Sequence, residues 1–192
     1  MSARLADLPL LEPADRALWS AWLEANHRTS PGVWLAVGKK GNSRTALTYE
    51  DAVEEAVRFG WIDSTTRRLD EDRFQQLFTP RKPGSTWSQS NKARVDRLEA
   101  RGLMTPAGRA AVESAKANGS WNSLDEIDSL TVPEDLAAAL AATPAADEYF
   151  AGLAPSQRKM ILYWITTAKR PETRARRIAE TVRAAGQSRM PL

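Results

Sequence analysis

The side chains that could bind a ligand are concentrated in residues 59–91. Two prolines stiffen the backbone of this stretch on either side of Arg81 and Lys82, which supply positive charge. Ser88 comes where a helix is expected to begin, and the free N–H groups of a helix start favour an anion. The sequence therefore predicts either a basic, tryptophan-lined pocket for a small anionic ligand or a satisfied structural network. The predicted ligand-binding residues are Trp61, Asp63, Ser64, Thr79, Arg81, Trp87, Ser88 and Asn91.

Asp63 allows further interpretations. Its carboxylate could form a structural ion pair with Arg67, Arg81 or Lys92. It could instead act together with Ser64 in an unrecognised enzyme, which would require a deep pocket and a perturbed carboxylate pKa. No catalytic signature favours the enzyme, so we interpret the chain as a non-enzymatic binding protein.

Several kinds of chemistry are excluded or unsupported. The chain has no cysteine, which excludes thiolate metal sites, iron–sulfur clusters and cysteine nucleophiles. The one histidine, His27, comes at the end of an expected helix, where an imidazole interacts well with the last carbonyls. No pair of carboxylates lies beside it at a ligand spacing, and no nucleotide-binding glycine motif occurs. We therefore expect no metal and no cofactor.

Charge is distributed unevenly along the chain, although the net charge is only +3. Residues 67–109 and 153–192 are basic in balance, and the acidic block 110–152 lies between them. The blocks could neutralise each other in the fold or attract an anionic partner. The most basic run predicts an amphipathic helix that could contact nucleic-acid phosphates or an anionic membrane surface. The candidate nucleic-acid-binding residues are Lys169, Arg170, Arg174 and Arg177.

The elements that position the 59–91 stretch are predicted from periodicity and capping residues. Alternating patterns on both sides of an acidic turn predict a β-hairpin over residues 62–79. A short apolar run predicts a further strand over residues 33–37. Helices are predicted over 13–27, from Thr48 to Gly60, from Ser88 to Gly102 and from Thr105 to Gly119. The sequence thus predicts an α+β domain, residues 1–119, with a small antiparallel sheet packed by helices.

The C-terminal part is predicted to be all-helical. Residues 120–131 are polar and acidic and are interpreted as a linker. The helical domain, residues 132–192, is predicted to contain helices over 133–141, 144–153, 156–169 and 172–185. The N-terminus lacks the apolar region of a signal peptide, and no 18-residue apolar run follows. We therefore expect a cytoplasmic protein without a membrane span, and the oligomeric state stays open.

An ordered set of short motifs resembles a known family. The motifs are Phe59–Ser64, Phe78–Arg81, Ser85–Asn91, Leu103-Met104 with Gly108, and Trp164–Arg174. Over residues 34–185 they resemble, in the same order, the YdeI/OmpD-associated proteins, also called the bacteriocin-protection family. The resemblance implies a bacterial α+β protein with a helical C-terminal region and no established catalytic residues. It also implies a link to the stress response or bacteriocin tolerance, and to envelope proteins. We expect a small anionic ligand or a protein partner.

Overall fold

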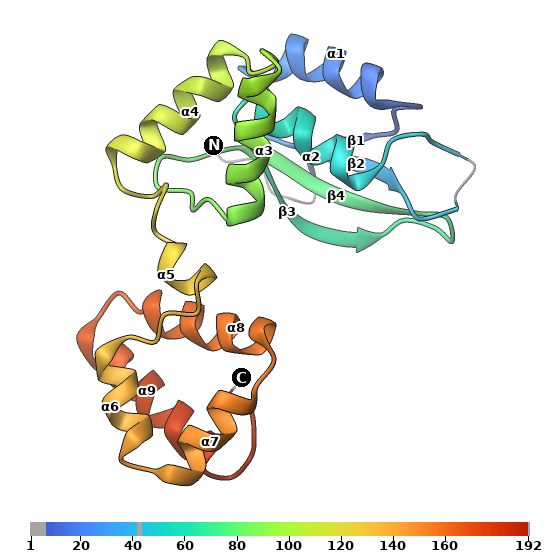
Figure 1. Cartoon of the computed structure of the whole chain (residues 1–192). Coiled ribbons are helices and arrows are strands. Elements are labelled where there is room, and N and C mark those ends of the chain that lie inside the picture. Colours follow the sequence, from blue (N-terminus) through green and yellow to red (C-terminus); the bar gives the residue numbers. More distant parts are fainter. Residues whose placement is uncertain (1–6, 42–43, 192) are drawn as a thin grey trace. The chain divides into compact units, whose positions relative to one another are not determined.

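The computed structural model describes residues 7–41 and 44–191 of the 192-residue chain. The chain divides into two compact units, residues 1–122 (unit 1) and residues 123–192 (unit 2). In the described residues, unit 1 holds a small sheet with helices and unit 2 holds helices only (Figure 1). The predicted α+β class, with an all-helical C-terminal part, is confirmed.

The sheet of unit 1 is mixed and not purely antiparallel. The predicted hairpin is present as β3 and β4, and β4 also pairs antiparallel with β2. The sheet order is β1-β2-β4-β3, in which β1 pairs parallel with β2. β1 was not predicted because two residues are too few to show a period-2 pattern. The strands are β1 Leu10–Leu11, β2 Val33–Gly38, β3 Trp61–Arg68 and β4 Arg73–Pro80.

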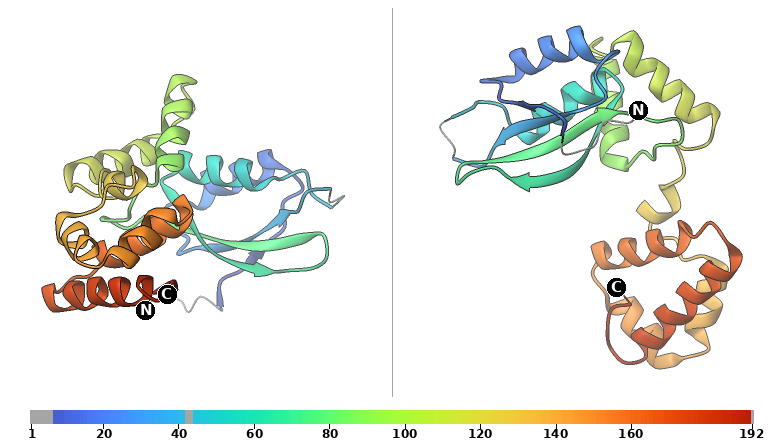
Figure 2. Two further views of the ribbon diagram at one scale, coloured as in Figure 1. Left: turned by 60° about the horizontal axis from the view of Figure 1, so that its bottom comes forward. Right: turned by 180° about the vertical axis from the view of Figure 1, so that it is seen from behind.

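Four helices accompany this sheet, and they lie over one of its faces (Figures 1 and 2). Three of them begin at predicted capping residues. Thr48, Ser88 and Thr105 each accept a hydrogen bond from the backbone N–H three residues on, at 3.1, 3.3 and 3.2 Å. The helices are α1 Arg16–Asn26, α2 Tyr49–Arg58, α3 Gln89–Ala100 and α4 Pro106–Ala117.

The core of unit 1 is rich in tryptophan. Trp19 is fully buried and stacks on Trp22 with ring centroids 5.4 Å apart, and Trp22 meets Trp61 edge-on at 5.9 Å. Every second residue of β2 joins them because alternate strand side chains face the same side. Each fully buried large apolar side chain contributes roughly 1.5–3 kcal/mol. The largest such side chains in this core include Trp19, Leu23, Leu35, Leu47, Trp61, Phe78, Trp87 and Leu98.

The start of α4 is held against the end of α2 by a close backbone approach. A Cβ atom added to Gly108 would lie 2.2 Å from the carbonyl oxygen of Arg58, so only glycine fits there. The same carbonyl accepts a hydrogen bond from the Thr105 hydroxyl at 2.6 Å. Gly60 lies beside this crossing with φ +75°, as its predicted place after the helix requires. This crossing fixes α4, which forms one wall of the candidate site.

Unit 2 has its own apolar core, formed mainly by Leu136, Leu140, Phe150, Ile161 and Ile165. Its helices are α5 Asp125–Asp128, α6 Glu134–Ala141, α7 Pro144–Gly152, α8 Pro155–Thr166 and α9 Pro171–Ala185. The described residues include no helix that is long and apolar enough to cross a membrane.

The predicted linker, residues 120–131, contains the boundary between the two units. Its two ends are packed in different units. Trp121 packs on Trp87 in unit 1, with ring centroids 5.1 Å apart, and Ile127 of α5 is buried in the core of unit 2. The boundary itself falls between Asn122 and Ser123.

Candidate functional site

Arg81 is the charged residue at the centre of the candidate site. It directly follows β4, and its backbone N–H donates to the carbonyl of Gly60 at 3.0 Å. Its guanidinium carbon lies 3.5 Å from the ring centroid of Trp87, which is van der Waals contact across the face of the indole. Nη1 donates to the carbonyl of Thr86 at 3.0 Å. Nε and Nη2 are buried and have no hydrogen-bond partner within residues 7–41 and 44–191.

The environment of Arg81 disfavours its charge. Burial lowers the pKa of its guanidinium to about 10, and the carboxylate of Asp63 opposes this shift without cancelling it. The group is still a cation at neutral pH. Two covered donors without an acceptor on a partly buried cation are costly, and proteins usually pair such groups. Nε and Nη2 of Arg81 are thus donors for which the described residues supply no acceptor.

A small cavity adjoins Arg81. Its volume is about 80 Å³, which is roughly the volume of two or three water molecules. The exposed turn over residues 82–85 forms one wall, and small residues of α4 form another. The lining residues are Arg81, Lys82, Pro83, Gly84, Ser85, Trp87, Ala111, Ser114 and Ala115. The cavity has room for a small anion or for the charged end of a larger one.

Six of the eight predicted site residues do not line this cavity, and three of them, Trp61, Ser64 and Thr79, lie in the core or in the sheet. Trp61 is buried in the core, where its Nε1 donates to the carbonyl of His27 at 3.2 Å. Thr79 is half-buried in β4 opposite Ile62, and Ser64 is exposed on β3. None of the three is among the residues that line the Arg81 cavity. Of the two predicted tryptophans, Trp87 is the one that lines it.

Asp63 and Asn91 belong to a neighbouring polar cluster. The hydroxyl of Tyr49 donates to Asp63 at 2.7 Å, and burial together with this bond raises the pKa of Tyr49 to about 12. The side-chain oxygen of Asn91 accepts from Arg94 at 3.1 Å, so the amide has the partner that its burial requires. Ser88 caps α3. Arg67, one of the proposed partners of Asp63, lies 4.3 Å above the ring of Trp34.

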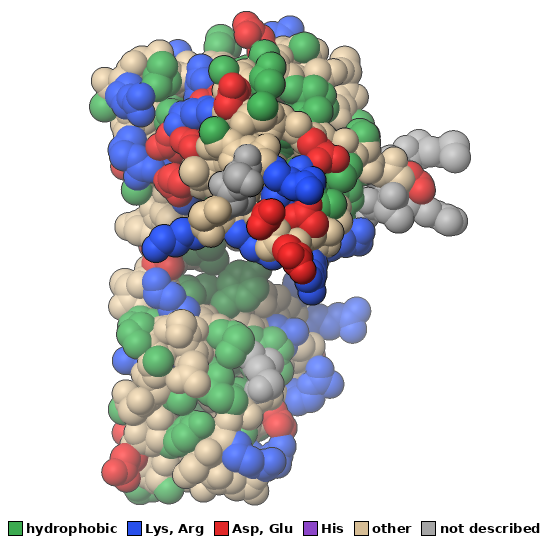
Figure 3. Space-filling view, turned by 90° about the vertical axis from the view of Figure 1, so that its right-hand side faces the viewer, with side chains coloured by type: hydrophobic (Ala, Val, Ile, Leu, Met, Phe, Trp, Pro, Cys, Tyr) green, Lys and Arg blue, Asp and Glu red, His purple; other side chains and the backbone are tan. Residues whose placement is uncertain are grey.

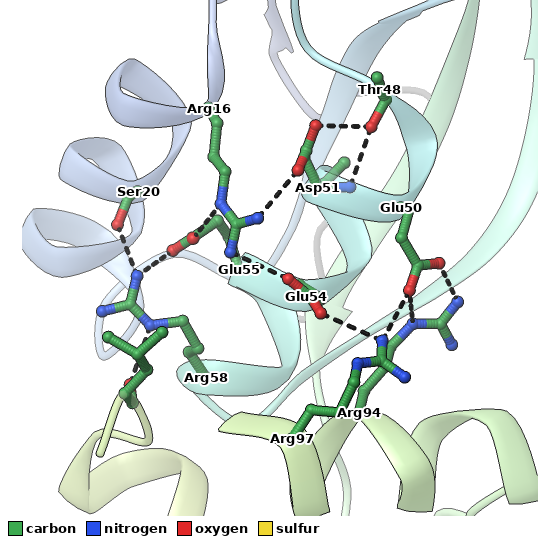
Figure 4. Close-up of polar contacts among 12 residues, drawn as sticks. Arg16, Ser20, Thr48, Glu50, Asp51, Glu54, Glu55, Arg58, Arg94 and Arg97 are labelled. Atoms are coloured by element: carbon green, nitrogen blue, oxygen red, sulfur yellow. Dashed lines mark hydrogen bonds and ion pairs between the residues drawn. The ribbon is translucent and has the colours of Figure 1, made fainter. Parts of the chain in front are cut away.

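A buried ion-pair network on α2 was not expected from the sequence. The carboxylate of Glu55 forms an ion pair with Arg16 at 2.7 Å and a second one with Arg58 (Figure 4). The carboxylate of Glu54 also pairs with Arg16, at 3.1 Å. Arg97 then joins Glu54 to Glu50. The network ties α1 and α3 to α2. On the face in Figure 3, acidic and basic side chains of unit 1 accordingly lie next to one another.

One signal for this network is present in the sequence. The acidic residues of α2, Glu50, Asp51, Glu54 and Glu55, occupy two adjacent turns. Every residue from Ala52 to Val57 is buried. Because this run includes Glu54 and Glu55, the helix buries two carboxylates together with its apolar side chains. Their arginine partners lie up to 47 residues away, which periodicity cannot identify.

The candidate nucleic-acid-binding residues of α9 are partly engaged within unit 2. Arg174 binds both carboxylate oxygens of Asp135, at 2.6 and 2.8 Å, which lowers the pKa of Asp135. Arg177 donates to the carbonyl of Trp164 and lies over its ring. Lys169 and Arg170 are both exposed and directly precede α9. The ion pair between Arg174 and Asp135 thus connects the basic block 153–192 with the acidic block 110–152.

The apolar side of α9 forms an open groove with α6. Its volume is about 850 Å³, and small apolar side chains such as Ala139, Ala175 and Ala179 line it. This groove is the roomiest of the cavities described here, but it contains no buried unpaired charge.

Metal ligation has no support in the described residues. Residues 7–41 and 44–191 contain no group of three or more His, Asp or Glu side chains that could hold an ion. The Nδ1 atom of His27 lies 2.9 Å from the carbonyl oxygen of Leu23, so the imidazole caps the end of α1 as expected.

Comparisons with known proteins divide the chain in a similar place. A family model described as "Domain of unknown function (DUF8412)" matches residues 11–111. A second model, described as "Bacteriocin-protection, YdeI or OmpD-Associated", matches residues 129–187. Neither a curated protein nor a solved structure matches the chain.

The family resemblance found in the sequence is confirmed for residues 129–187. The motifs between Phe59 and Gly108 lie in the stretch that the DUF8412 model matches. The resemblance to the bacteriocin-protection family therefore covers fewer residues than the predicted range 34–185. The bacteriocin-protection match suggests a protective or stress-related function. The chain belongs to the DUF8412 family, and residues 129–187 in unit 2 are similar to the Bacteriocin-protection, YdeI or OmpD-Associated family.

Proposed function

We propose that this protein binds a small anion at Arg81 and that this binding serves a bacteriocin-protection or stress role. The observation that carries the proposal is the state of the Arg81 guanidinium. It is half-buried against Trp87, it borders a cavity, and two of its nitrogens are covered and have no partner in the described residues.

The energetics of the unused donors favour a ligand. A buried donor left without an acceptor costs about 1–3 kcal/mol, and charged groups cost more. An anion that accepts from Nε and Nη2 removes this cost and also neutralises a desolvated cation. Hydrogen bonds between two charged groups are roughly twice as strong as neutral ones. Binding should therefore be strong for a ligand of so few atoms.

The wall of the cavity offers a route to the guanidinium. Nε and Nη2 are covered by neighbouring atoms, so the anion must displace part of the wall to reach them. The turn over residues 82–85 is exposed and is closed by two local hydrogen bonds, of 2.9 and 3.1 Å, between Lys82 and Ser85. In the proposal this turn moves outward and closes again over the bound anion.

The proposal assigns a binding function and no catalytic step. The carboxylate of Asp63 accepts from Tyr49, and Ser64 is exposed on a strand, so the pair does not form a shared reactive site. The internal contacts of Arg174 and Arg177 likewise favour no nucleic-acid surface. Protection from a bacteriocin or from stress is carried over from the family match of unit 2. The cytoplasmic location stays a prediction from the sequence.

Tryptophan fluorescence provides the test. Trp87 contacts Arg81, so an anion bound there should change its emission. The full chain is titrated with acetate, sulfate and chloride at constant ionic strength, which holds general screening fixed. Arg81→Ala should abolish the saturable response, whereas Arg101→Ala, at an exposed arginine ending α3, should retain it. A response that persists in Arg81→Ala, or no response to any anion, would refute the proposal.

A further inference from the structure

We infer that the ligand of the Arg81 cavity is a monocarboxylate, held side-on by the Nε and Nη2 donors of Arg81. This inference rests on the proposed function and identifies the class of anion.

The first step concerns which atoms of the guanidinium are unused. Nε and Nη2 form one edge of the planar group, and their two N–H bonds point in parallel from that edge. Nη1, which lies away from this edge, is already used by the carbonyl of Thr86. The unused part of Arg81 is thus a complete two-donor fork. A fork of this geometry fits two oxygens on one planar centre, as a carboxylate presents them.

The second step concerns charge. Of the two cations that line the cavity, Arg81 is half-buried with Nε and Nη2 covered, whereas Lys82 is exposed. A single negative charge balances one guanidinium. A dianion such as sulfate would carry a second charge into the same enclosed space, where desolvation costs several kcal/mol per ion. The ammonium of Lys82, kept in water, compensates little of that cost.

The third step concerns the remaining walls. Apart from the turn, the cavity is lined mainly by apolar residues, among them Ala111, Ala115 and Trp87. A carboxylate carries a carbon substituent that suits such walls, whereas a tetrahedral oxyanion directs two more oxygens at them. The hydroxyl of Ser85, which already accepts from the backbone of Lys82, keeps its own proton to donate to a carboxylate oxygen. A volume of about 80 Å³ limits the enclosed part to a few atoms, such as acetate or propionate.

The test compares anions on the full-length chain. Acetate, propionate, sulfate and chloride are titrated separately at constant ionic strength and pH 7, with binding followed by calorimetry. The Nε–H signal of Arg81 is followed by NMR and assigned through its loss in Arg81→Lys. We expect acetate or propionate to shift that signal and to bind at least about tenfold more tightly than sulfate. Arg81→Lys keeps the charge but loses the fork, and it should reduce the preference for carboxylate over sulfate to below about threefold.

Each outcome separates the two proposals. Sulfate or chloride binding as tightly as acetate, with the Arg81 signal shifted, would overturn the carboxylate inference and leave anion binding intact. Failure of every anion to shift the Arg81 signal would overturn both. A carboxylate preference that survives in Arg81→Lys, with the thermal stability of the variant unchanged, would also overturn the role of the fork. Arg101→Lys is the matched control and should bind all four anions as the wild type does.

Discussion

Unit 1 contains two sets of wholly or partly buried charged side chains, and they differ in whether the charges are paired. On α2, the carboxylates of Glu54 and Glu55 each meet two arginines, and the network joins three helices (Figure 4). Beside Trp87, the guanidinium of Arg81 makes one side-chain hydrogen bond and leaves its other edge unused within the described residues. Removing one partner of a buried ion pair is strongly destabilising because it leaves an uncompensated charge, and a covered charge without a partner is costly unless a ligand supplies one.

This difference assigns separate roles to residues of the same kind. Arg16 and Arg58 are structural because their carboxylate partners lie within the unit. Arg81 is proposed as a binding residue because two of its nitrogens have no partner in the described residues. The predictions below test this division, beginning with the largest expected change in free energy.

Glu55→Ala should destabilise unit 1 by about 3 kcal/mol, because it leaves Arg16 and Arg58 without their shared carboxylate. The free energy of unfolding is measured by urea denaturation followed by tryptophan fluorescence. Glu24→Ala, at an exposed position on α1, is the control and should change it by less than about 0.5 kcal/mol. Equal effects of the two substitutions would show that the network is not structural.

The α2 network was not predicted from the sequence, whereas the helix caps and the hairpin were. Caps at Thr48, Ser88 and Thr105 were predicted because a helix start depends on residues three apart. The hairpin was predicted from alternation between neighbours. The arginine partners of Glu54 and Glu55 were not predicted, because an ion pair between helices that are far apart in the sequence produces no local sequence pattern.

The candidate site was predicted only in part, because only some of its contacts are between residues close in the sequence. Arg81 and Trp87 lie six positions apart on a short, proline-stiffened segment, so their proximity was foreseeable. The placement of Trp61 in the core depends on Trp22 of α1, far away in the sequence. The α4 wall of the cavity depends on the contact between Gly108 and Arg58. Tertiary packing, which the local pattern does not record, decides these placements.

The affinity for an anion should depend on pH through Arg81. Burial lowers the pKa of this group to about 10, so the cation is present below that pH and is lost above it. Affinity should be constant from about pH 7 to 9 and should then fall by up to about tenfold per pH unit. Calorimetric titration with acetate measures this dependence. Lys82→Ala is the control, because Lys82 is the other cation that lines the cavity. An unchanged profile in that variant supports Arg81, whereas a profile that becomes flat would assign the dependence to Lys82.

The ion pair between Asp135 and Arg174 at the surface should contribute less to the free energy of unfolding than the ion pairs on α2. The bond from Arg174 lowers the pKa of Asp135, so the stabilisation is present above the ordinary carboxyl pKa and is lost as pH falls below it. The side chain of Asp135 is 47% exposed, and such pairs contribute about 0.5 kcal/mol. Asp135→Asn should therefore lower the unfolding free energy of unit 2 by about that amount at pH 7 and by nothing at pH 2.

Glu134→Gln is the matched control for this substitution. Glu134 lies in the same first turn of α6, so both residues interact similarly with the helix dipole. The two variants should differ by the contribution of the Arg174 bond. No difference between them at pH 7 would mean that solvent screens the pair completely.

Arg81→Met gives the most direct test, because methionine keeps the contact with Trp87 and removes only the charge and the donors. The free energy of unfolding is measured for the wild type and the variant, each with and without saturating acetate at constant ionic strength. Without acetate, the variant should be at least as stable as the wild type, because the substitution removes two covered donors that have no partner in the described residues. At 100 times the dissociation constant, acetate should stabilise the wild type by about 2.7 kcal/mol and the variant by nothing. If Arg81→Met costs more than about 2 kcal/mol without acetate, or if acetate stabilises both proteins equally, then Arg81 is a structural residue and the account is wrong.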